Sequence, residues 1–286
     1  MVRKRLAAYA RLMRLHRPIG SLLLLWPTLW ALWFARHGRP DPGLVLVFVS
    51  GVVLMRSAGC VINDYADRRF DPAVWRTRDR PLATGEVSAR EALILFAVLC
   101  LVTAGLGVWL NPLSRALAVV AVGLAASYPF MKRYTHLPQV YLGLAFGWGI
   151  PMAFAAETGR VPVLAWILLL ANVFWTIAYD TAYAMADRAD DQRIGVKSSA
   201  ILFGRWDRIM VAVNHALALA LLYAIGVWAR LGALYDVGLL AALGFAVYEQ
   251  WLIRAREPLA CFRAFLNNNW FGGSVFVGLV AAYLGR

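Results

Sequence analysis

Carboxylate and amide side chains gather at the end of an apolar segment in the first quarter of the chain. The group consists of Asn63, Asp64, Asp67 and Asp71. If the segment continues as a helix, spacings of i, i+4 and i+8 put the whole group on roughly one face. Because crowded carboxylates repel one another and are costly near a membrane, this pattern favours a site for a divalent cation.

A second acidic group closes another apolar segment far along the chain. It contains Asp180, Asp187, Asp190 and Asp191. Within it, Asp187 and Asp191 repeat the i, i+4 spacing of the first group. If the two groups meet across a cavity, they would suit a substrate that carries phosphates and a metal.

The residue types of both groups indicate which metal they would hold. Magnesium prefers carboxylate oxygens, keeps several waters, and commonly links one or two carboxylates to substrate phosphates. Zinc would favour Cys and His, which neither group contains. The sequence therefore predicts a magnesium site with oxygen donors only, in preference to solvated carboxylates paired with neighbouring arginines. Its ligands would be Asn63, Asp67, Asp187 and Asp191.

Basic side chains follow both acidic groups. They are Arg68, Arg69, Arg76, Arg78 and Arg80 after the first group, Arg188, Arg193 and Lys197 after the second, and Lys132 and Arg133 in a short segment between. Some would serve only the orientation of the chain in the membrane, but arginine also offers the bidentate donors that a diphosphate needs.

A diphosphate ester inside an apolar helical bundle points to a lipid diphosphate. If the lipid is prenyl, metal and cations would stabilise the departing diphosphate while an electron-rich acceptor captures the allylic cation away from water.

The composition excludes a soluble globular domain. Of the residues, 61% are hydrophobic and 16% are charged, which is typical of a polytopic membrane protein. The net charge of +13 does not indicate nucleic-acid binding, because the basic residues lie between apolar spans, where they orient a membrane protein. The three cysteines, Cys60, Cys100 and Cys261, are too few and too scattered for a disulfide framework or a zinc site.

Apolar runs long enough to cross a bilayer predict an all-α membrane protein with nine transmembrane helices. The predicted spans are 19–35, 44–62, 92–110, 114–131, 139–156, 162–180, 209–229, 234–253 and 269–285. Most Lys and Arg residues fall on the side that carries the N-terminus and both acidic groups, which puts that side in the cytoplasm and the C-terminus outside. No segment is rich enough in Pro, Gly or Ser to divide the chain, so residues 1–286 are expected to form a single domain.

Three smaller features complete the pattern. The acidic groups lie in two long predicted cytoplasmic loops, 63–91 and 181–208, and long ordered loops are usually functional. Gly143 and Gly147 form a Gly-x-x-x-Gly pattern that predicts close helix packing. The run Asn267-Asn268-Asn269 is expected to cap the last helix, in preference to the alternative that it forms part of a polar site.

The acidic motifs also resemble those of a known family. Asn63-Asp64-x-x-Asp67-x-x-x-Asp71 and Asp187-x-x-x-Asp191, each after an even-numbered span, are similar to the paired aspartate-rich motifs of the UbiA prenyltransferase superfamily. Other segments resemble the bacterial branch of that superfamily that prenylates 4-hydroxybenzoate. These are Arg17-Pro18-Ile19-Gly20, Arg80-Pro81-Leu82, Tyr128-Pro129-Phe130-Met131-Lys132-Arg133, Tyr179-Asp180-Thr181-x-Tyr183 and Lys197-Ser198-Ser199. The resemblance covers nearly the whole chain.

The resemblance implies nine helices around a central cavity that opens sideways to lipid. It implies a location in a bacterial inner membrane, with the C-terminus periplasmic and the active site facing the cytoplasm. It further implies Mg²⁺ as cofactor and transfer of a polyprenyl group from polyprenyl diphosphate to the ring carbon ortho to the hydroxyl of 4-hydroxybenzoate, a step of ubiquinone biosynthesis. No nucleic-acid partner is expected, and the oligomeric state stays open.

Carried over by position, the resemblance assigns roles to individual residues. Those similar to the metal–diphosphate ligands are Asn63, Asp67, Asp187 and Asp191, with Asp71 a further member of the catalytic motif. Those similar to diphosphate-binding residues are Ser127, Arg133 and Lys197. Arg17 resembles the basic residue that faces the acceptor carboxylate, with Arg14 and Arg56 as competing candidates. Trp75 departs from the pattern, because a basic residue that contacts the diphosphate is expected there.

Other functions fit parts of the pattern. The same fold could prenylate another acceptor, such as a naphthoate, homogentisate or haem, and a panel of acceptors would distinguish these. A cation-coupled transporter would bind its ions at the midplane of the membrane, whereas these acids cluster at the predicted cytoplasmic ends of spans. A phospholipid-forming phosphotransferase also uses Asp clusters and Mg²⁺, but its Asp-Gly-x-x-Ala-Arg pattern is missing from this sequence.

Overall fold

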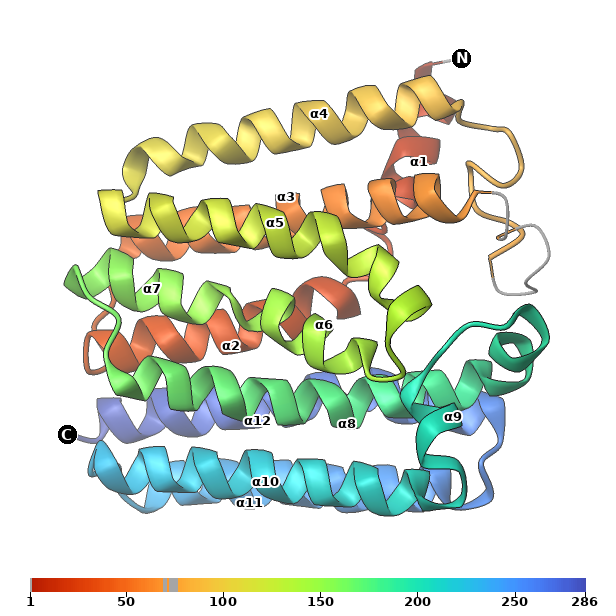
Figure 1. Ribbon diagram of the computed structural model, residues 1–286. Helices are drawn as coiled ribbons and strands as arrows, with labels where there is room; N and C mark the ends of the chain where they lie inside the picture. Colours follow the sequence, from red (N-terminus) through yellow and green to blue (C-terminus); the bar gives the residue numbers. More distant parts are fainter. Residues whose placement is uncertain (1, 69–70, 72–76) are drawn as a thin grey trace. The chain divides into compact units, whose positions relative to one another are not determined.

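The computed structural model describes the chain except for residues 1, 69–70 and 72–76 (Figure 1). Every regular element of the described residues is a helix, which confirms the predicted all-α class. The chain divides into two compact units. The first is formed by Met1–Leu22 and Leu46–Leu110, and the second by Leu23–Val45 and Asn111–Arg286.

The first unit combines an amphipathic helix with long apolar ones. Its elements are α1 (Val2–Leu12), most of α3 (Pro42–Asp67), α4 (Ala89–Leu106) and the short η2 (Gly107–Trp109). A further helix, α2 (Ile19–Ala35), begins in this unit and continues into the second. Ala8 and Leu12 of α1 pack with Ala58 and Val61 of α3 in a buried apolar cluster. The apolar face of α1 is therefore covered by the helix that carries the first acidic group.

The start of α4 is determined by its own sequence and by α1. The Ser88 side chain accepts a hydrogen bond from the Glu91 backbone N–H, while a Glu91 carboxylate oxygen accepts one from the Ser88 backbone N–H at 2.9 Å. This reciprocal pair is a capping box. The Tyr9 hydroxyl donates to the other Glu91 oxygen at 3.0 Å. The C-terminal half of α1 is thereby attached to the first turn of α4.

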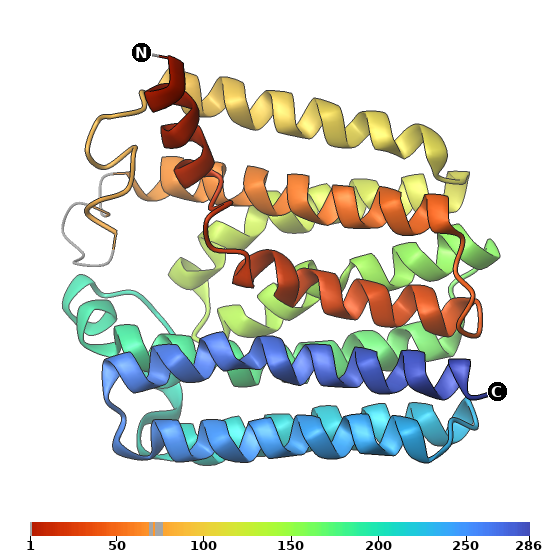
Figure 2. The same cartoon turned by 180° about the vertical axis from the view of Figure 1, so that it is seen from behind.

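The second unit contains the remaining helices. They are α5 (Pro112–Tyr134), α6 (Pro138–Gly147), α7 (Gly149–Thr158), α8 (Val163–Ile194), α9 (Ser199–Phe203), η3 (Gly204–Trp206), α10 (Asp207–Trp228), α11 (Ala233–Leu252), η4 (Ile253–Ala255) and α12 (Pro258–Leu284). Four long helices, α8, α10, α11 and α12, form a bundle in which each packs against two others (Figure 1, Figure 2). On the other side of α8 lies α6, which also contacts α5.

Small residues let α6 approach α8 closely. A Cβ atom added at Gly143 would lie 2.9 Å from the Val173 Cα atom, and one added at Gly147 would lie 2.5 Å from Asn172 Nδ2. Neither position leaves room for a side chain. The Gly-x-x-x-Gly pattern therefore marks close helix packing, as predicted.

Several helices are suited to a bilayer. Among the described residues, six helices are long and apolar enough to cross a membrane by length and composition. They are Pro42–Asp67, Ala89–Trp109, Pro138–Thr158, Val163–Arg193, Ser199–Trp228 and Ala233–Ala255, with Ile19–Ala35 and Pro112–Tyr128 as shorter apolar helices. Large apolar side chains on them are exposed, for example Leu101 at 72% and Leu240 at 65%, as expected where lipid is the solvent. The chain is therefore a multi-pass membrane protein.

The helix α8 extends well beyond the predicted span. The sequence predicts a span that ends at residue 180, followed by a long loop, but α8 continues to Ile194 and ends at Gly195, which has a left-handed φ of 72°. The prediction of a long loop over 181–208 was wrong, because most of that range is helical. Asp187 and Asp191 consequently lie on a continuous helix.

The helix α12 begins earlier than predicted. It starts at Pro258, directly after Glu257 in an extended conformation, and proline is well suited to the first turn of a helix. The run Asn267-Asn268-Asn269 thus lies inside α12, and the prediction that it caps the helix was wrong. These side chains instead enter contacts between helices, described below.

Candidate active site

The first acidic group is divided between a helix and the segment that follows it. Asn63 and Asp67 lie in the last turns of α3, four residues apart and so on one face. Because α3 ends at Asp67, Asp71 lies beyond the helix and not on the face that a continued helix would give it. Arg80 Nη1 lies 3.1 and 3.0 Å from the two Asp71 carboxylate oxygens. Burial raises the pKa of Asp71, and the Arg80 guanidinium opposes that rise.

Asp64 is held in a buried ion-pair network. Arg14 Nη2 lies 2.8 Å from each carboxylate oxygen of Asp64, and Arg80 Nη1 lies 2.9 Å from one of them. The Asp64 side chain is only 1% exposed. Since a buried carboxylate is tolerated as an ion when it is paired, the two arginines make Asp64 a structural group. The arginine pairing that the sequence left as an alternative is thus found at Asp64 and Asp71.

Arg56 shares a face of α3 with Asn63 and Asp67. These two residues follow Arg56 by seven and eleven positions, which are close to two and three full helical turns. The Arg56 guanidinium lies against Gly20, where an added Cβ atom would come within 2.4 Å of it. The absence of a side chain at Gly20 therefore leaves the space that this arginine fills.

The first unit also contains the candidates for binding the acceptor carboxylate. Arg17, the residue favoured by the resemblance, lies between α1 and α2 with an exposed side chain. Arg14 is engaged by Asp64, so its role is structural. Two candidates are left, the exposed Arg17 and Arg56 inside the apolar helix α3. Trp75 lies outside the described residues.

The second acidic group occupies one face of α8. Asp187 and Asp191 follow Asp180 by seven and eleven positions, again nearly whole turns. Both act electrostatically on the Asp180 carboxyl group, and the Gln139 side chain of α6 contacts that carboxyl group as well. The three carboxylates thus lie close enough on α8 to influence one another, and the first of them, Asp180, also contacts α6.

Other charged residues near the end of α8 serve the structure. Asp190 lies 3.3 Å from Arg193 in an ion pair one turn away on the same helix. Arg188 Nη2 donates to the Ala200 carbonyl at 2.9 Å and forms an ion pair with the buried Asp207. Arg188 therefore ties α8 to α9 and to the start of α10.

The three predicted diphosphate-binding residues lie in the second unit. Lys197 Nζ donates to the Tyr134 carbonyl at 3.3 Å, which brings the segment after α8 against the end of α5. Arg133 is exposed at that same end of α5. Ser127 lies less than two turns earlier on α5, and its hydroxyl is hydrogen-bonded to the Tyr141 hydroxyl of α6. The structure thus brings Lys197 and Arg133 to one place, with Ser127 further along α5.

The predicted magnesium ligands form two pairs. Asn63 and Asp67 belong to α3, whereas Asp187 and Asp191 belong to α8. In the part of the chain that the structure describes, no group of three or more His, Cys, Asp or Glu side chains is arranged to hold a metal ion. Each pair nevertheless offers two oxygen donors at helical spacing, and Mg²⁺ completes its shell with waters and substrate phosphates. The donor chemistry therefore fits Mg²⁺ bound together with a diphosphate.

A buried polar cluster in the bundle of α8, α10, α11 and α12 escaped prediction. Asn268 Oδ1 accepts from Trp175 Nε1 at 2.8 Å, and Asn268 Nδ2 donates to Glu249 Oε2 at 2.9 Å. His215 Nε2 lies 3.2 Å from Asn268 Oδ1 and 3.3 Å from Glu249 Oε2. The cluster links all four helices. The available signal was Glu249, an ionisable residue inside an apolar predicted span.

Comparison with known proteins identifies relatives along the whole chain. A sequence model of the UbiA prenyltransferase family matches residues 24–273. A protein of Methylococcus capsulatus named 4-hydroxybenzoate octaprenyltransferase is 62% identical over 283 residues, which cover 99% of this chain and 97% of that protein. A protein of the same name from Nitrosococcus oceani is 60% identical over 283 residues, which cover 99% of each chain.

Solved structures share the fold at lower sequence identity. A UbiA homologue from Aeropyrum pernix matches with a TM-score of 0.79 and 24% identity, covering 93% of this chain and 97% of its own. A UbiA homologue from Archaeoglobus fulgidus bound to GPP and Mg²⁺ matches with a TM-score of 0.71 and 17% identity, covering 96% of this chain and 99% of its own. The similarity covers both units of the described chain.

Proposed function

This chain belongs to the UbiA prenyltransferase family, and on that premise we propose that it is an enzyme that transfers a polyprenyl group from polyprenyl diphosphate to 4-hydroxybenzoate. The new bond forms at the ring carbon ortho to the hydroxyl, a membrane step of ubiquinone biosynthesis. The observation that carries the proposal is the pairing of oxygen donors at helical spacing on α3 and α8. The names of the relatives that are 62% and 60% identical support the choice of substrates.

The two donor pairs are proposed to bind Mg²⁺ and the diphosphate together. The ligands in this proposal are Asn63, Asp67, Asp187 and Asp191. When bound, Mg²⁺ would neutralise the diphosphate and stabilise its departure. Support comes from the oxygen-only donors and from the Archaeoglobus fulgidus homologue, whose structure is bound to GPP and Mg²⁺. Asp71 would act through Arg80, which joins it to Asp64.

We propose that Lys197 and Arg133 bind the diphosphate and neutralise the negative charge that Mg²⁺ leaves on it. Lys197 is held at the end of α5 through the Tyr134 carbonyl, and Arg133, the residue before Tyr134, has an exposed side chain. An arginine fork matches the oxygens of a phosphate, and a lysine adds a mobile point charge. Ser127, hydrogen-bonded to Tyr141, would supply a hydroxyl further along the same helix.

The bond changes define what the acceptor site must do. The carbon–oxygen bond to the diphosphate breaks with its electron pair on the diphosphate, and the allylic cation is attacked by the ring carbon ortho to the hydroxyl. That carbon then releases its proton. The acceptor carboxylate would be oriented by Arg17 or by Arg56, because arginine binds carboxylates through two donors. Apolar helices around the reacting carbon would keep water from capturing the cation.

The proposed topology has nine membrane spans, with the N-terminus and both acidic groups in the cytoplasm and the C-terminus in the periplasm of a bacterial inner membrane. The distribution of Lys and Arg along the sequence supports this orientation. Residues 1–286 would then act as one prenyltransferase domain.

A direct assay tests the proposed function. Purified protein is incubated with Mg²⁺, geranyl diphosphate and a panel of acceptors consisting of 4-hydroxybenzoate, a dihydroxynaphthoate and homogentisate. The expected result is a prenylated product from 4-hydroxybenzoate that disappears when EDTA removes the metal. Prenylation of another panel member alone would reassign the acceptor, and ion uptake into liposomes without any product would support a transporter instead.

A further inference from the structure

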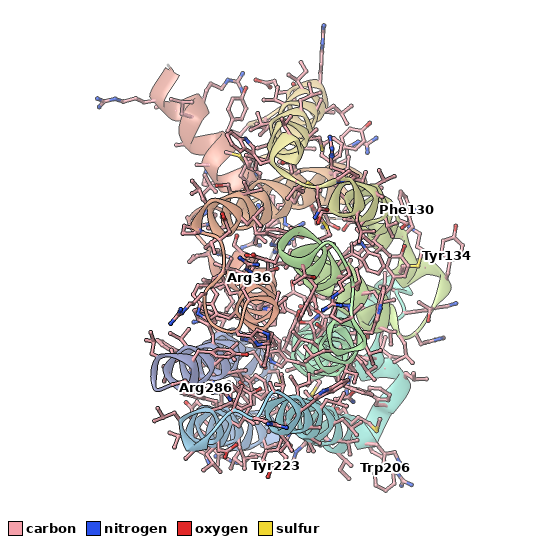
Figure 3. All side chains as sticks on the ribbon, turned by 90° about the vertical axis from the view of Figure 1, so that its left-hand side faces the viewer. Arg36, Phe130, Tyr134, Trp206, Tyr223 and Arg286 are labelled. Atoms are coloured by element: carbon pink, nitrogen blue, oxygen red, sulfur yellow. The ribbon has the colours of Figure 1, made fainter. Side chains whose placement is uncertain are left out.

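A basic hollow lies where α2 and α7 end in the second unit. It has a volume of about 720 Å³ and is lined by Arg36, His37, Arg39, Glu157, Thr158 and Arg160; we refer to it as the arginine pocket. Figure 3 shows Arg36 at the end of the second unit that faces the viewer, where Arg286 also lies. None of the residues that line the arginine pocket belongs to the candidate active site.

The arginine pocket is remote from the second acidic group. Arg160 lies three positions before Val163, where α8 begins, and Asp187 is 24 positions further along that helix. At 1.5 Å per residue, these 24 residues span roughly 36 Å, which exceeds the thickness of the hydrocarbon core of a bilayer. In the proposed topology, in which α8 spans the bilayer, the pocket and Asp187 therefore lie at opposite membrane interfaces.

Positive charge in the arginine pocket exceeds negative charge. Its one acidic residue, Glu157, has a side chain that is 1% exposed and lies 3.5 Å from Arg36 Nε. Glu157 also accepts a hydrogen bond from the Asp41 backbone N–H at 3.0 Å. Within the described residues, the side chains of Arg39 and Arg160 have no hydrogen-bond or ion-pair partner. Two guanidinium groups are thus left to bind an anion from outside the chain.

The turn that carries these cations is fixed by its own geometry. His37 and Gly38 both adopt left-handed backbone, with φ of 49° and 86°. A Cβ atom at Gly38 would lie 2.3 Å from the Tyr283 Cβ atom of α12, so the turn is packed tightly against that helix. The hydrogen bond from Asp41 to Glu157 holds its other end. The arginine pocket is therefore largely pre-formed, which lowers the entropic cost of binding.

From these observations we infer that the arginine pocket binds the phosphate of an anionic lipid headgroup. Arginine recognises phosphate through paired donors, and a pocket at a membrane interface meets phosphate chiefly as lipid headgroups. In the proposed topology the pocket lies on the outer side of the membrane, where arginine is disfavoured, yet three of the few basic residues of that side gather in it. A bound anionic headgroup accounts for their presence. The inference is independent of the prenyl-transfer reaction.

The test measures thermal unfolding of the full chain in neutral detergent micelles. The probes are phosphatidylglycerol, phosphatidylcholine and inorganic phosphate, each added to the wild type and to the double variant Arg39→Gln/Arg160→Gln. We expect phosphatidylglycerol to raise the unfolding midpoint of the wild type by about 3 °C, and the double variant to lose most of this shift. Arg230→Gln is the matched control, since Arg230 is exposed at the same end of the second unit but outside the pocket.

Several results would overturn the inference. One is no midpoint shift with phosphatidylglycerol, and another is the same shift in the double variant as in the wild type. A shift that Arg230→Gln abolishes equally would mean that general surface charge is responsible. Equal stabilisation by zwitterionic phosphatidylcholine, or by inorganic phosphate alone, would exclude a site for an anionic lipid. Native mass spectrometry of retained phosphatidylglycerol gives a second readout, with retention about tenfold lower in the double variant.

Discussion

Arg14 Nη2 lies 2.8 Å from both carboxylate oxygens of Asp64, and this ion pair fastens the end of α1 to α3. The Asp64 side chain is 1% exposed, so the pair is a buried structural contact next to the predicted metal ligands. The same Asp64 also meets Arg80 at 2.9 Å. The first acidic motif therefore contains two kinds of carboxylate, one that organises the helices and one that is proposed to bind metal.

Breaking this ion pair should destabilise the first unit. Arg14→Gln leaves the buried Asp64 carboxylate with Arg80 as its main partner. We expect the free energy of unfolding to fall by about 2 kcal/mol, which is less than for a completely unpaired carboxylate. Adding Asp64→Asn to Arg14→Gln removes the buried charge and should recover part of the loss. The unfolding midpoint in detergent measures both effects, and equal midpoints for wild type and Arg14→Gln would refute a structural role.

The polar cluster around Asn268 should stabilise the four-helix bundle. Asn268→Ala leaves Trp175 Nε1 without its hydrogen-bond acceptor in an apolar interior and removes one of the donors to Glu249. We therefore expect the free energy of unfolding to fall by about 1–3 kcal/mol. Asn214→Ala is the matched control, since Asn214 is also buried but donates only to the Met210 carbonyl of its own helix. If Asn214→Ala lowers the free energy of unfolding as much as Asn268→Ala does, the cluster contributes no more to stability than any buried asparagine.

Gly20 provides a test of Arg56. In Gly20→Ala the new Cβ atom would lie 2.4 Å from the Arg56 guanidinium, so the arginine must move while the fold is kept. We expect a rise of about tenfold in KM for 4-hydroxybenzoate with little change in the unfolding midpoint. Gly59→Ala on α3 is the control, because an added Cβ atom meets nothing within 4 Å there and alanine favours a helix. Unchanged kinetics in Gly20→Ala would argue against a role for the position of Arg56.

Direct substitutions separate the two candidates for the acceptor carboxylate. Loss of a two-pronged arginine contact should raise KM for 4-hydroxybenzoate by about 10- to 100-fold and leave KM for geranyl diphosphate nearly unchanged. We expect this pattern in Arg17→Gln or in Arg56→Gln, whichever residue binds the carboxylate. Steady-state kinetics with each substrate varied in turn measure it. If neither variant affects the acceptor, both assignments fail.

Local patterns in the sequence predicted the helices well and their ends less well. The apolar run of α8 stops at residue 180, yet the helix continues to Ile194, because backbone hydrogen bonds do not require apolar side chains. Asp71, beyond the end of α3 at Asp67, is paired with Arg80 nine positions further along, a contact that helical spacing does not contain. Helix caps follow from position as much as residue type, which is why Pro258 and not Asn267 marks the start of α12.

The candidate site was predicted to a similar degree. Spacing alone put Asp187 and Asp191 on one helix face, and the structure has both on α8. The same reasoning put Asp64 in the first acidic group without a structural partner, because local spacing cannot show that Arg14, fifty positions earlier, pairs with it. The buried cluster of Asn268 with Glu249 depends on packing between helices and was missed for the same reason.

The central claim is that oxygen donors from both acidic motifs bind the metal and diphosphate that drive prenylation. The most direct measurement is the Mg²⁺-dependent rate of 4-hydroxybenzoate prenylation by purified Asp67→Asn and Asp187→Asn, compared with the wild type. Asp190→Asn is the matched control, because Asp190 is paired with Arg193 on the same helix. We predict that the prenylation rate falls about 100-fold or more in Asp67→Asn and in Asp187→Asn, and that it stays within about twofold of the wild-type rate in Asp190→Asn. A wild-type rate in either Asp67→Asn or Asp187→Asn would contradict the claim.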